Sequence, residues 1–362
     1  MDFLEELHHT VKAICTPGKG ILAADESTGT IGKRLASISL ENTLENRIKY
    51  RKLLFTTNGL ENNISGVITY EETLKNTELI KPLLDKGIVV GIKTDLGAKP
   101  LYGTNGETVT QGIDNLDKRC EEYYQLGARF AKWRAILKIS DDGCPSELSI
   151  KENAMTLARY ASISQKHGLV PIVEPEILMD GNHSILKSKE ITQKVISRVY
   201  QSLVEHNVVL SATLLKPNMV RPGISNESGA DDKTIAQMTV EALYNAVPPS
   251  VPGIVFLSGG MSEIQATNVL NNMYHINNTK LDKPWYLSFS YGRALQASVL
   301  KTWMGKSDNI LLAQEQLLKR AKANGLATLG EYLTIDEYIN ELNKHNLTSN
   351  GNTSLHVENY SY

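Results

Sequence analysis

One lysine of this sequence stands where an apolar, strand-like run must stop. Lys216 follows Thr213, Leu214 and Leu215 and directly precedes Pro217. A lysine that is crowded by other cations and by apolar walls loses its proton more readily, and its neutral amine can attack a carbonyl to form an iminium. Because an iminium withdraws electrons from an adjacent carbon–carbon bond, Lys216 predicts bond cleavage through a Schiff base.

Further charged residues follow other strand-like runs and supply the groups that such chemistry needs. Lys132 could provide the neighbouring positive charge. Glu174 and Glu176 could perform the acid–base steps that dehydrate a carbinolamine, and Asp25 could take a proton from the hydroxyl next to the breaking bond. A structural cluster of salt bridges is the alternative interpretation, but charges at six strand ends together favour a functional site.

Glycines, hydroxyl residues and cations flank this centre and predict two anion sites. Backbone N–H groups after the seventh and eighth strands of a barrel often bind phosphate. The residues placed there are Ser258, Gly259, Ser290, Gly292 and Arg293. A second group could form an anion site across the mouth and consists of Ser27, Thr30, Lys93 and Arg134. Although ordinary turn chemistry would explain the glycines and serines alone, two anion sites beside a lysine suggest a sugar bisphosphate.

Eight short apolar runs must position these residues. They cover residues 20–25, 64–70, 89–95, 128–134, 170–176, 213–218, 254–259 and 286–292. Most are near-continuous rather than alternating, which is typical of parallel strands buried on both faces. Helical patterns between and after them cover residues 110–126, 149–167, 187–205, 232–245, 262–274 and 295–304, with Gly127 and Gly168 as expected C-caps.

The alternation of strands and helices predicts an α/β fold, a (β/α)8 TIM barrel with an N-terminal helical arm and a flexible C-terminal tail. A doubly wound open sheet is the alternative, but eight uninterrupted units favour closure. We expect one domain over residues 1–362, with the barrel at about 20–304. Residues 305–362 should add helices at 309–323 and 335–343 before a polar tail.

Composition and motifs exclude several other classes of protein. The 362 residues carry 38 Lys and Arg against 40 Asp and Glu, for a formal net charge of -2, which argues against general binding of nucleic acid. The sequence has no run of about 18 apolar residues, so no membrane-spanning helix is expected. The three cysteines form no CxxC pair, so a reducing compartment is expected, and the N-terminus has no secretory pattern. Neither a metal nor a cofactor is expected, because the histidines lack metal-ligand spacing and no nucleotide-binding motif stands in its required context.

Seven segments, in order, resemble the class I fructose-1,6-bisphosphate aldolase family. They read GKGILAADESTGTIGKRL, GIKTDLG, AKWRAILKI, PIVEPEILMDG, TLLKPNMV, FLSGGMSE and SFSYGRALQAS, and they run from residue 18 to residue 298. With the C-terminal tyrosine, the resemblance covers nearly the whole chain. It implies reversible cleavage of fructose 1,6-bisphosphate to dihydroxyacetone phosphate and glyceraldehyde 3-phosphate without a metal, in the cytosol, by a homotetramer.

The resemblance also implies a role for each site residue. Lys216 corresponds to the Schiff-base lysine, and Glu174 to the acid/base that dehydrates the carbinolamine, with Glu176 and Lys132 assisting. Asp25 corresponds to the residue that handles the C4-hydroxyl proton, and Tyr362 to the tyrosine that exchanges the proton at the enamine carbon. The C1 phosphate would be held by Ser258, Gly259, Gly292 and Arg293, and Ser290 is a further expected substrate-binding residue. The C6 phosphate would be held by Ser27, Thr30, Lys93 and Arg134, with Arg34 as a nearby positioning residue.

Two alternatives to this function stay open at the level of sequence. Another Schiff-base barrel lyase could act on a different phosphosugar. A binding role is the second alternative, in which the basic cleft holds acidic peptide tails or actin. Thr30 stands where many family members have serine, but the hydroxyl is kept.

Overall fold

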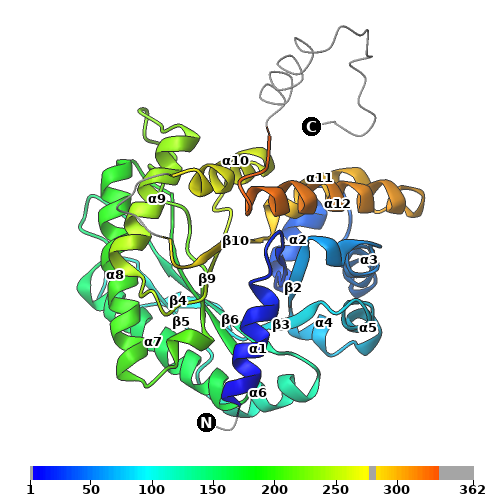
Figure 1. The fold of residues 1–362 in the computed structure, drawn as a ribbon, viewed down its shortest axis with the longest axis horizontal. Coiled ribbons are helices and arrows are strands. Elements are labelled where there is room, and N and C mark those ends of the chain that lie inside the picture. The colour runs from blue at the N-terminus through cyan, green and yellow to red at the C-terminus, as the bar shows by residue number, and fades with distance from the viewer. Residues whose placement is uncertain (1–2, 277–282, 334–362) are drawn as a thin grey trace, which may run out of the picture.

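Eight parallel strands close into a barrel with helices around it (Figure 1). The computed structural model describes residues 3–276 and 283–333. Around the barrel the strands follow the order β1, β10, β9, β8, β7, β6, β3, β2. Their bounds are β1 Gly20–Ala24, β2 Ile64–Thr69, β3 Val89–Lys93, β6 Phe130–Leu137, β7 Val170–Ile177, β8 Leu214–Leu215, β9 Gly253–Phe256 and β10 Tyr286–Tyr291. The predicted TIM barrel is therefore confirmed.

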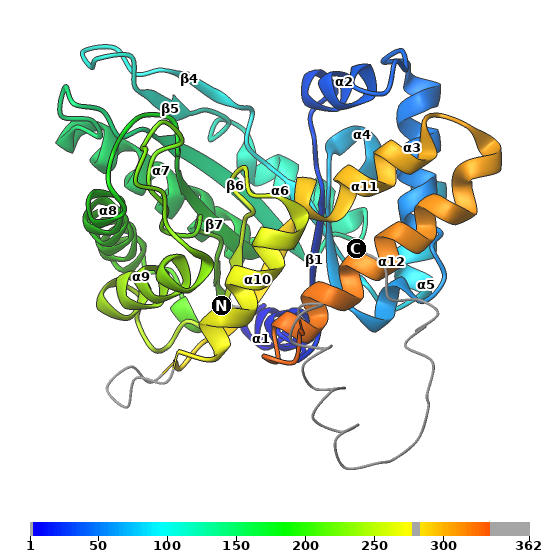
Figure 2. The same ribbon diagram turned by 90° about the horizontal axis from the view of Figure 1, so that it is seen from above.

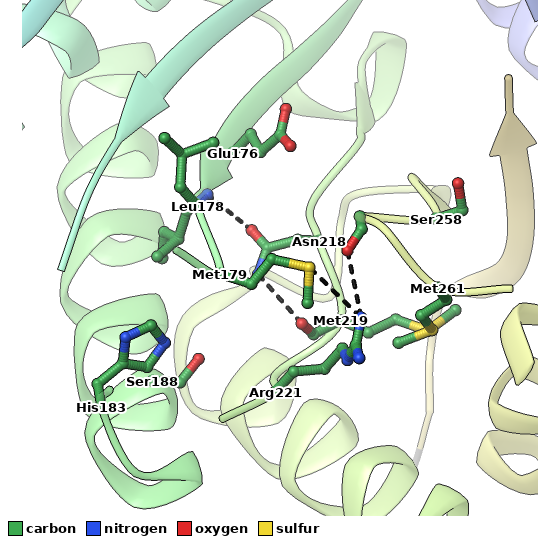
Figure 3. Close-up of a pocket in the computed structure, with 12 residues that line it drawn as sticks. Glu176, Leu178, Met179, His183, Ser188, Asn218, Met219, Arg221, Ser258 and Met261 are labelled. Carbon is green, nitrogen blue, oxygen red and sulfur yellow. Dashed lines mark hydrogen bonds between the residues drawn. The ribbon is translucent and has the colours of Figure 1, made fainter. Parts of the chain in front are cut away.

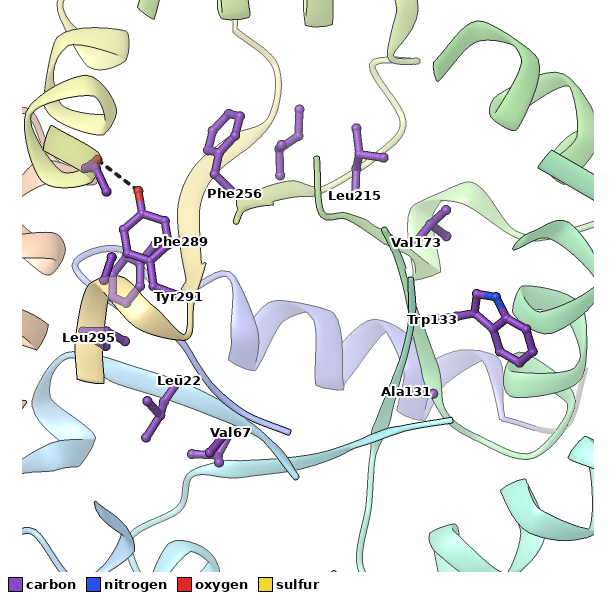
Figure 4. Close-up of a cluster of buried hydrophobic side chains, with 14 of the residues drawn as sticks. Leu22, Val67, Ala131, Trp133, Val173, Leu215, Phe256, Phe289, Tyr291 and Leu295 are labelled. Atoms are coloured by element: carbon purple, nitrogen blue, oxygen red, sulfur yellow. Dashed lines mark hydrogen bonds between the residues drawn. The ribbon is translucent and has the colours of Figure 1, made fainter. Parts of the chain in front are cut away.

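The strands divide their side chains between the barrel interior and the surrounding helices. Successive residues of a strand point to opposite faces. On β6, Phe130 packs inside the barrel with Ile172, whereas Ala131 and Trp133 pack in the outer core under the helices. Figure 4 shows Trp133, Val173 and other outer side chains pointing away from the ring of strands. Burial on both faces explains why these strands read as continuous apolar runs.

One glycine makes room for the largest side chain inside the barrel. The Phe130 ring lies so close to Gly91 of β3 that a Cβ atom on Gly91 would stand 2.2 Å from it. Such a contact would displace either the ring or the strand. Gly91 thus allows an aromatic side chain to fill the barrel below the charged residues.

Helices cover the outside of the barrel and one of its ends. They are α1 Leu4–Ile14, α2 Thr28–Ala36, α3 Leu44–Phe55, α4 Glu71–Leu74, α5 Thr77–Asp85, α6 Leu116–Gln125, α7 Glu147–Lys166, α8 Ile185–Glu205, α9 Asp232–Ala246, α10 Glu263–Tyr274, α11 Arg293–Trp303 and α12 Ile310–Ala327. Short 3-10 turns cover Leu60–Asn62, Leu210–Ala212 and Ser307–Asn309. Gly127 and Gly168 follow α6 and α7 with φ of 97° and 73°, as expected of C-cap glycines.

The N-terminal helix α1 closes the amino end of the barrel. Its Leu7, Val11 and Ile14 join the interior cluster of the strands. The hydroxyl of Ser65, near the start of β2, donates to the carbonyl of Ile14 at 2.8 Å. Figure 2 shows α1 at the end opposite to α2 and to the strands β4 and β5. The carboxyl ends of the strands therefore remain open for a site.

One predicted helix begins later than expected. Residues 110–126 were expected to be helical, but Thr108–Thr110 forms strand β5, which pairs antiparallel with β4, Ala98–Pro100, and α6 begins only at Leu116. The β-branched threonines favour the strand, and the Thr110 hydroxyl fixes it by donating to the carbonyl of Arg134 at 2.7 Å. Gly112, with a φ of 123°, then turns the chain before the helix starts.

The remaining sequence-based bounds differ more modestly. Strands β6 and β7 run three residues and one residue further than expected, and α2, α3 and α5 lie in segments for which no helix was named. The helix expected at 335–343 and the tail lie outside the described residues. Helix α12 packs on α10 and α11, and the single-domain division stays a prediction. None of the helices in the described segments is long and apolar enough to span a membrane.

Candidate active site

Four largely buried charged side chains, on or directly after four strands, form a connected cluster in the mouth of the barrel. The Lys132 Nζ lies 2.7 Å from Asp25 Oδ2 and 3.3 Å from Glu174 Oε2. The other oxygen of Glu174, Oε1, lies 3.3 Å from the Nζ of Lys216. Glu174 therefore bridges two lysines, and Lys132 bridges two carboxylates.

The period-two alternation of the strands places these four residues at one level. Each lies two residues beyond an apolar residue of the barrel interior. The pairs are Ala23 and Asp25, Phe130 and Lys132, Ile172 and Glu174, and Leu214 and Lys216. Since residues two apart on a strand share a face, the same faces that fill the barrel below present the charges above. The structure brings these four predicted site residues together, and their roles stay a prediction.

The charges of Asp25 and Lys132 stabilise one another despite their burial. Burial disfavours an ionised carboxyl, yet the attraction of Lys132 and then of Lys216 outweighs it and holds the pKa of Asp25 well below its usual value. Burial likewise disfavours a charged amine, but Asp25 and Glu174 together raise the pKa of Lys132 above its usual value. Asp25 is therefore a carboxylate and Lys132 a cation at neutral pH.

The carboxylate of Glu174 is placed to exchange protons beside Lys216. Its side chain is 5% exposed, and its Oε2, which lies 3.3 Å from Lys132 Nζ, accepts no hydrogen bond from the described residues. A buried oxygen without a hydrogen bond retains the capacity to accept a proton or to bond a substrate group. The arrangement can therefore transfer protons at an atom bonded to the Lys216 amine.

Two further ion pairs lie beside the central cluster. Arg134 Nε pairs with Glu176 Oε2, and Lys93 Nζ lies 2.7 Å from Asp95 Oδ1. Burial alone would lower the pKa of Arg134, but Glu176 raises it above its usual value. Glu176 shares a strand face with Glu174 yet is bound to Arg134, so the two predicted acid/base residues occupy different surroundings. Asp95 accepts a hydrogen bond from the Arg134 backbone N–H at 3.4 Å and so connects the two pairs.

The residues predicted to bind the C1 phosphate gather at the ends of β9 and β10. A Cβ atom on Gly260 would lie 3.9 Å from Arg293 Nη2, so the arginine that begins α11 lies near the turn after β9. Gly259 and Gly260 have φ of 48° and 80°, which favours glycine at both positions. Ser258 is buried at the start of this turn, and the buried Ser290 hydroxyl has no hydrogen-bond partner in the part of the chain that the structure describes.

A buried network of hydrogen bonds and ion pairs holds Arg34 in place. Sequence reasoning did not predict this network. Glu26 is paired through one oxygen with Arg34 and through the other with Arg51. The amide of Gln296 donates to Glu26 at 3.2 Å and to the carbonyl of Ala23 at 2.8 Å. Arg34 Nη2 in turn lies 3.3 Å from the position of a Cβ on Gly292, so Glu26 fixes a cation at the start of α11. Glu26 directly follows Asp25, so this acid could be noticed in the sequence. Arg51 and Gln296 are distant from it along the chain, and no sequence pattern connects them to Glu26.

Replacing Glu26 with glutamine is expected to lower the free energy of unfolding by about 3 kcal/mol, because it leaves Arg51 buried without its counter-charge. Denaturant unfolding monitored by circular dichroism measures the change. Glu45→Gln is the matched control, since Glu45 pairs with Lys49 on an exposed helix face and its loss should leave stability unchanged. Equal effects of the two substitutions would contradict the assigned role of Glu26.

The remaining predicted site residues are less closely connected to the cluster. Ser27 caps α2, and its hydroxyl lies 3.1 Å from that of Thr30. No described contact joins this pair to Lys93 or Arg134, so the C6 phosphate site stays a prediction. Tyr362 lies outside the described residues. In the described segments, no group of three or more His, Cys, Asp or Glu side chains could hold a metal ion.

Comparison with known proteins gives one consistent result. The family model described as fructose-bisphosphate aldolase class-I matches residues 6–362. A cytosolic fructose-bisphosphate aldolase of Arabidopsis thaliana is 57% identical over 91% of this chain and 92% of its own length. The fructose-bisphosphate aldolase of Dictyostelium discoideum is 52% identical over 99% of this chain and 99% of its own length. A solved aldolase of Plasmodium falciparum, in complex with TRAP and a small-molecule inhibitor, aligns with a TM-score of 0.89 at 51% identity over 92% of this chain and 96% of its own. The chain therefore belongs to the class I fructose-bisphosphate aldolase family.

Proposed function

We propose that the protein reversibly cleaves fructose 1,6-bisphosphate to dihydroxyacetone phosphate and glyceraldehyde 3-phosphate through an iminium on Lys216, in glycolysis and gluconeogenesis. The observation that supports it most is the buried chain of contacts from Lys216 through Glu174 and Lys132 to Asp25. Family membership supports the same reaction.

Three members of the cluster each have one step in this reaction, and Lys132 supplies the positive charge between Asp25 and Glu174. The Lys216 amine attacks C2 of the sugar, and Glu174 transfers the protons that allow the carbinolamine to lose water. Asp25 then accepts the C4-hydroxyl proton, the C3–C4 bond breaks, and its electron pair moves into the iminium to leave an enamine. Glyceraldehyde 3-phosphate departs, and a proton returns to C3. Water then hydrolyses the iminium and releases dihydroxyacetone phosphate.

The two phosphates orient the sugar across the mouth. We assign the C1 phosphate to the turn after β9 and to Arg293 at the start of α11. A helix N-terminus and a guanidinium both favour a dianion there. The C6 phosphate is assigned to the side that carries Lys93, Arg134, Ser27 and Thr30. Arg34 lies between the two groups of elements and is assigned to substrate positioning.

Borohydride reduction in the presence of dihydroxyacetone phosphate tests the proposal directly. Reduction converts the iminium to a stable secondary amine, so we expect one covalent adduct, on Lys216, by peptide mass spectrometry, with loss of activity. An adduct on another lysine, or full activity after reduction, would reject the mechanism. Loss of cleavage on treatment with EDTA would point to a metal-dependent aldolase instead.

Tyr362 is proposed to exchange the proton at the enamine carbon. The support is the resemblance alone. Deleting Tyr362 should slow turnover while the borohydride adduct on Lys216 still forms, because the iminium precedes protonation. Unchanged turnover would exclude this role.

We further propose that the basic mouth binds acidic peptide tails. The solved structure of the Plasmodium falciparum relative is a complex with TRAP, and Lys93, Arg134, Arg34 and Arg293 supply cations on this chain. Fluorescence anisotropy with a labelled acidic peptide, and cosedimentation with actin, measure such binding. Competition by fructose 1,6-bisphosphate would support the mouth as the site, and the absence of competition would exclude it.

A homotetramer in the cytosol is the proposed state of the protein. The names of several relatives include the word cytosolic, and the tetramer rests on the family resemblance. Light scattering should give a mass four times the 40.0 kDa of one chain. A mass near that of a single chain would reject the tetramer.

A further inference from the structure

A second arginine, besides Arg293, lies near the turn that follows β9. Arg221 belongs to the segment between β8 and α9, five residues after Lys216. Figure 3 shows its side chain directed to the segments that follow β7 and β9, close to Met179 and among Asn218, Ser258 and Met261. None of the sequence patterns that predicted the site pointed to this residue.

The guanidinium of Arg221 connects three segments of the barrel mouth. Its Nη1 donates to the carbonyl of Gly259 at 3.2 Å and lies 3.4 Å from the sulfur of Met179. The Gly259 carbonyl belongs to the peptide whose N–H is that of Gly260. A cation on the carbonyl polarises this peptide and strengthens its N–H as a donor.

The charge of Arg221 is only partly compensated. Its Nε is buried and has no hydrogen-bond partner within residues 3–276 and 283–333, and none of the carboxylates there lies within 4.0 Å of the guanidinium. Burial lowers the pKa of Arg221, and the more distant Asp232 offsets this only in part. A partly buried cation without a paired carboxylate is stabilised by an anion that binds nearby.

Arg221 and Arg293 both lie near the same two glycines. Arg293 Nη2 is 3.9 Å from the Cβ position of Gly260, and Arg221 holds the carbonyl of Gly259. With φ of 48° and 80°, this turn is adopted readily only by glycine, whose conformational freedom must be restricted if its N–H groups are to point at a ligand.

We propose that Arg221 is a positioning and specificity-determining residue for the C1 phosphate, which fixes the Gly259–Gly260 turn through its carbonyl and adds positive potential behind the backbone N–H groups. The proposal rests on the function proposed above. It assigns Arg221 to the phosphate and not to the reacting carbonyl, and this distinction makes it testable.

Borohydride trapping with two ketones separates these roles. Dihydroxyacetone phosphate carries the phosphate, and dihydroxyacetone presents the same carbonyl without it. In Arg221→Met, the concentration of dihydroxyacetone phosphate that gives half-maximal trapping should rise about tenfold. That of dihydroxyacetone should change less than about twofold, because no phosphate contact exists to be lost. Arg221→Lys should restore part of the loss, since it keeps the charge but not the fork of the guanidinium.

Two controls accompany this pair of variants. Arg198→Met removes a guanidinium from the outer surface of α8, where it donates a hydrogen bond to Gln201. This substitution should leave the concentration for half-maximal trapping unchanged for both ketones. In the condensation direction, the concentration dependence on glyceraldehyde 3-phosphate should be unchanged in Arg221→Met, because that substrate carries only the C6 phosphate. Raising the ionic strength should reduce the difference between Arg221→Met and the unmodified chain.

Each result decides the proposal. If the concentration for half-maximal trapping rises only for dihydroxyacetone phosphate, the proposal is supported. If it rises equally for both ketones, or for neither, the proposal is overturned. If Arg221→Met does not fold, Arg221→Lys alone gives the same comparison of the two ketones. Absence of any adduct on the unmodified chain would overturn the proposed function together with this inference. Normal trapping on Lys216 that is insensitive to Arg221 would overturn the inference alone.

Discussion

Replacing Lys216 with methionine is expected to lower the turnover of fructose 1,6-bisphosphate by on the order of 10⁴-fold or more. Methionine has a similar length and suits a buried site, but it has no amine to attack a carbonyl. Without the iminium, the electron pair of the C3–C4 bond has no acceptor, so the bond cannot break at a useful rate. Steady-state kinetics measure the loss of cleavage, and borohydride trapping measures the loss of the covalent adduct. Both losses should be nearly complete.

Lys216→Arg is the control that separates charge from covalent chemistry. It keeps a cation facing Glu174 Oε1, which lies 3.3 Å from the lysine Nζ, but a guanidinium does not lose its proton and cannot form the iminium. Both variants should bind substrate measurably in calorimetry and neither should cleave it. Substantial cleavage by Lys216→Arg would show that the lysine acts only as a charge and would reject the Schiff-base mechanism.

The barrel could be predicted because burial on both faces leaves a direct trace in each strand. Val170 to Val173 and Gly253 to Phe256 are continuous apolar runs, which few elements other than buried parallel strands require. The β4–β5 hairpin could not be predicted in the same way. Its residues 98–100 and 108–110 are short and partly exposed, and Thr110 is held by a bond to the carbonyl of Arg134, which is a contact between distant residues.

The cluster of charged residues could be predicted for a related reason. Lys132, Glu174 and Lys216 fall near the ends of the predicted apolar runs, and parallel strands of a barrel bring such positions together. In the structure Lys132 and Glu174 lie within β6 and β7, which run further than expected, and Lys216 directly follows β8. The network of Glu26, Arg51 and Gln296 and the position of Arg221 carry no such sequence signal. Arg51 lies on a helix and Arg221 in a loop, so only the folded chain shows that one reaches Glu26 and the other the carbonyl of Gly259.

Exchanging Glu174 for glutamine should lower turnover by about 10²- to 10³-fold, which is a smaller loss of turnover than the one expected for Lys216→Met. The amide keeps the shape of the side chain between Lys132 and Lys216 but cannot donate and accept the protons that carbinolamine dehydration requires. The loss should appear in that step. Exchange of the carbonyl oxygen of dihydroxyacetone phosphate with ¹⁸O-labelled water requires the iminium to form and hydrolyse but no bond cleavage, so its rate should fall by about the same factor.

Glu176→Gln tests whether position within the cluster decides the role. Glu176 lies on the same strand face, two residues further, but it is paired with Arg134 rather than with either lysine. Its loss should slow oxygen exchange less than about tenfold, because the proton-transferring carboxylate beside Lys216 remains. Equal losses in both variants would mean that the acid–base function is shared, and a loss confined to Glu176→Gln would transfer it there. The 3.3 Å contact between Glu174 Oε1 and Lys216 Nζ favours Glu174, since a group that moves protons at the lysine-bound carbon must lie within reach of that nitrogen.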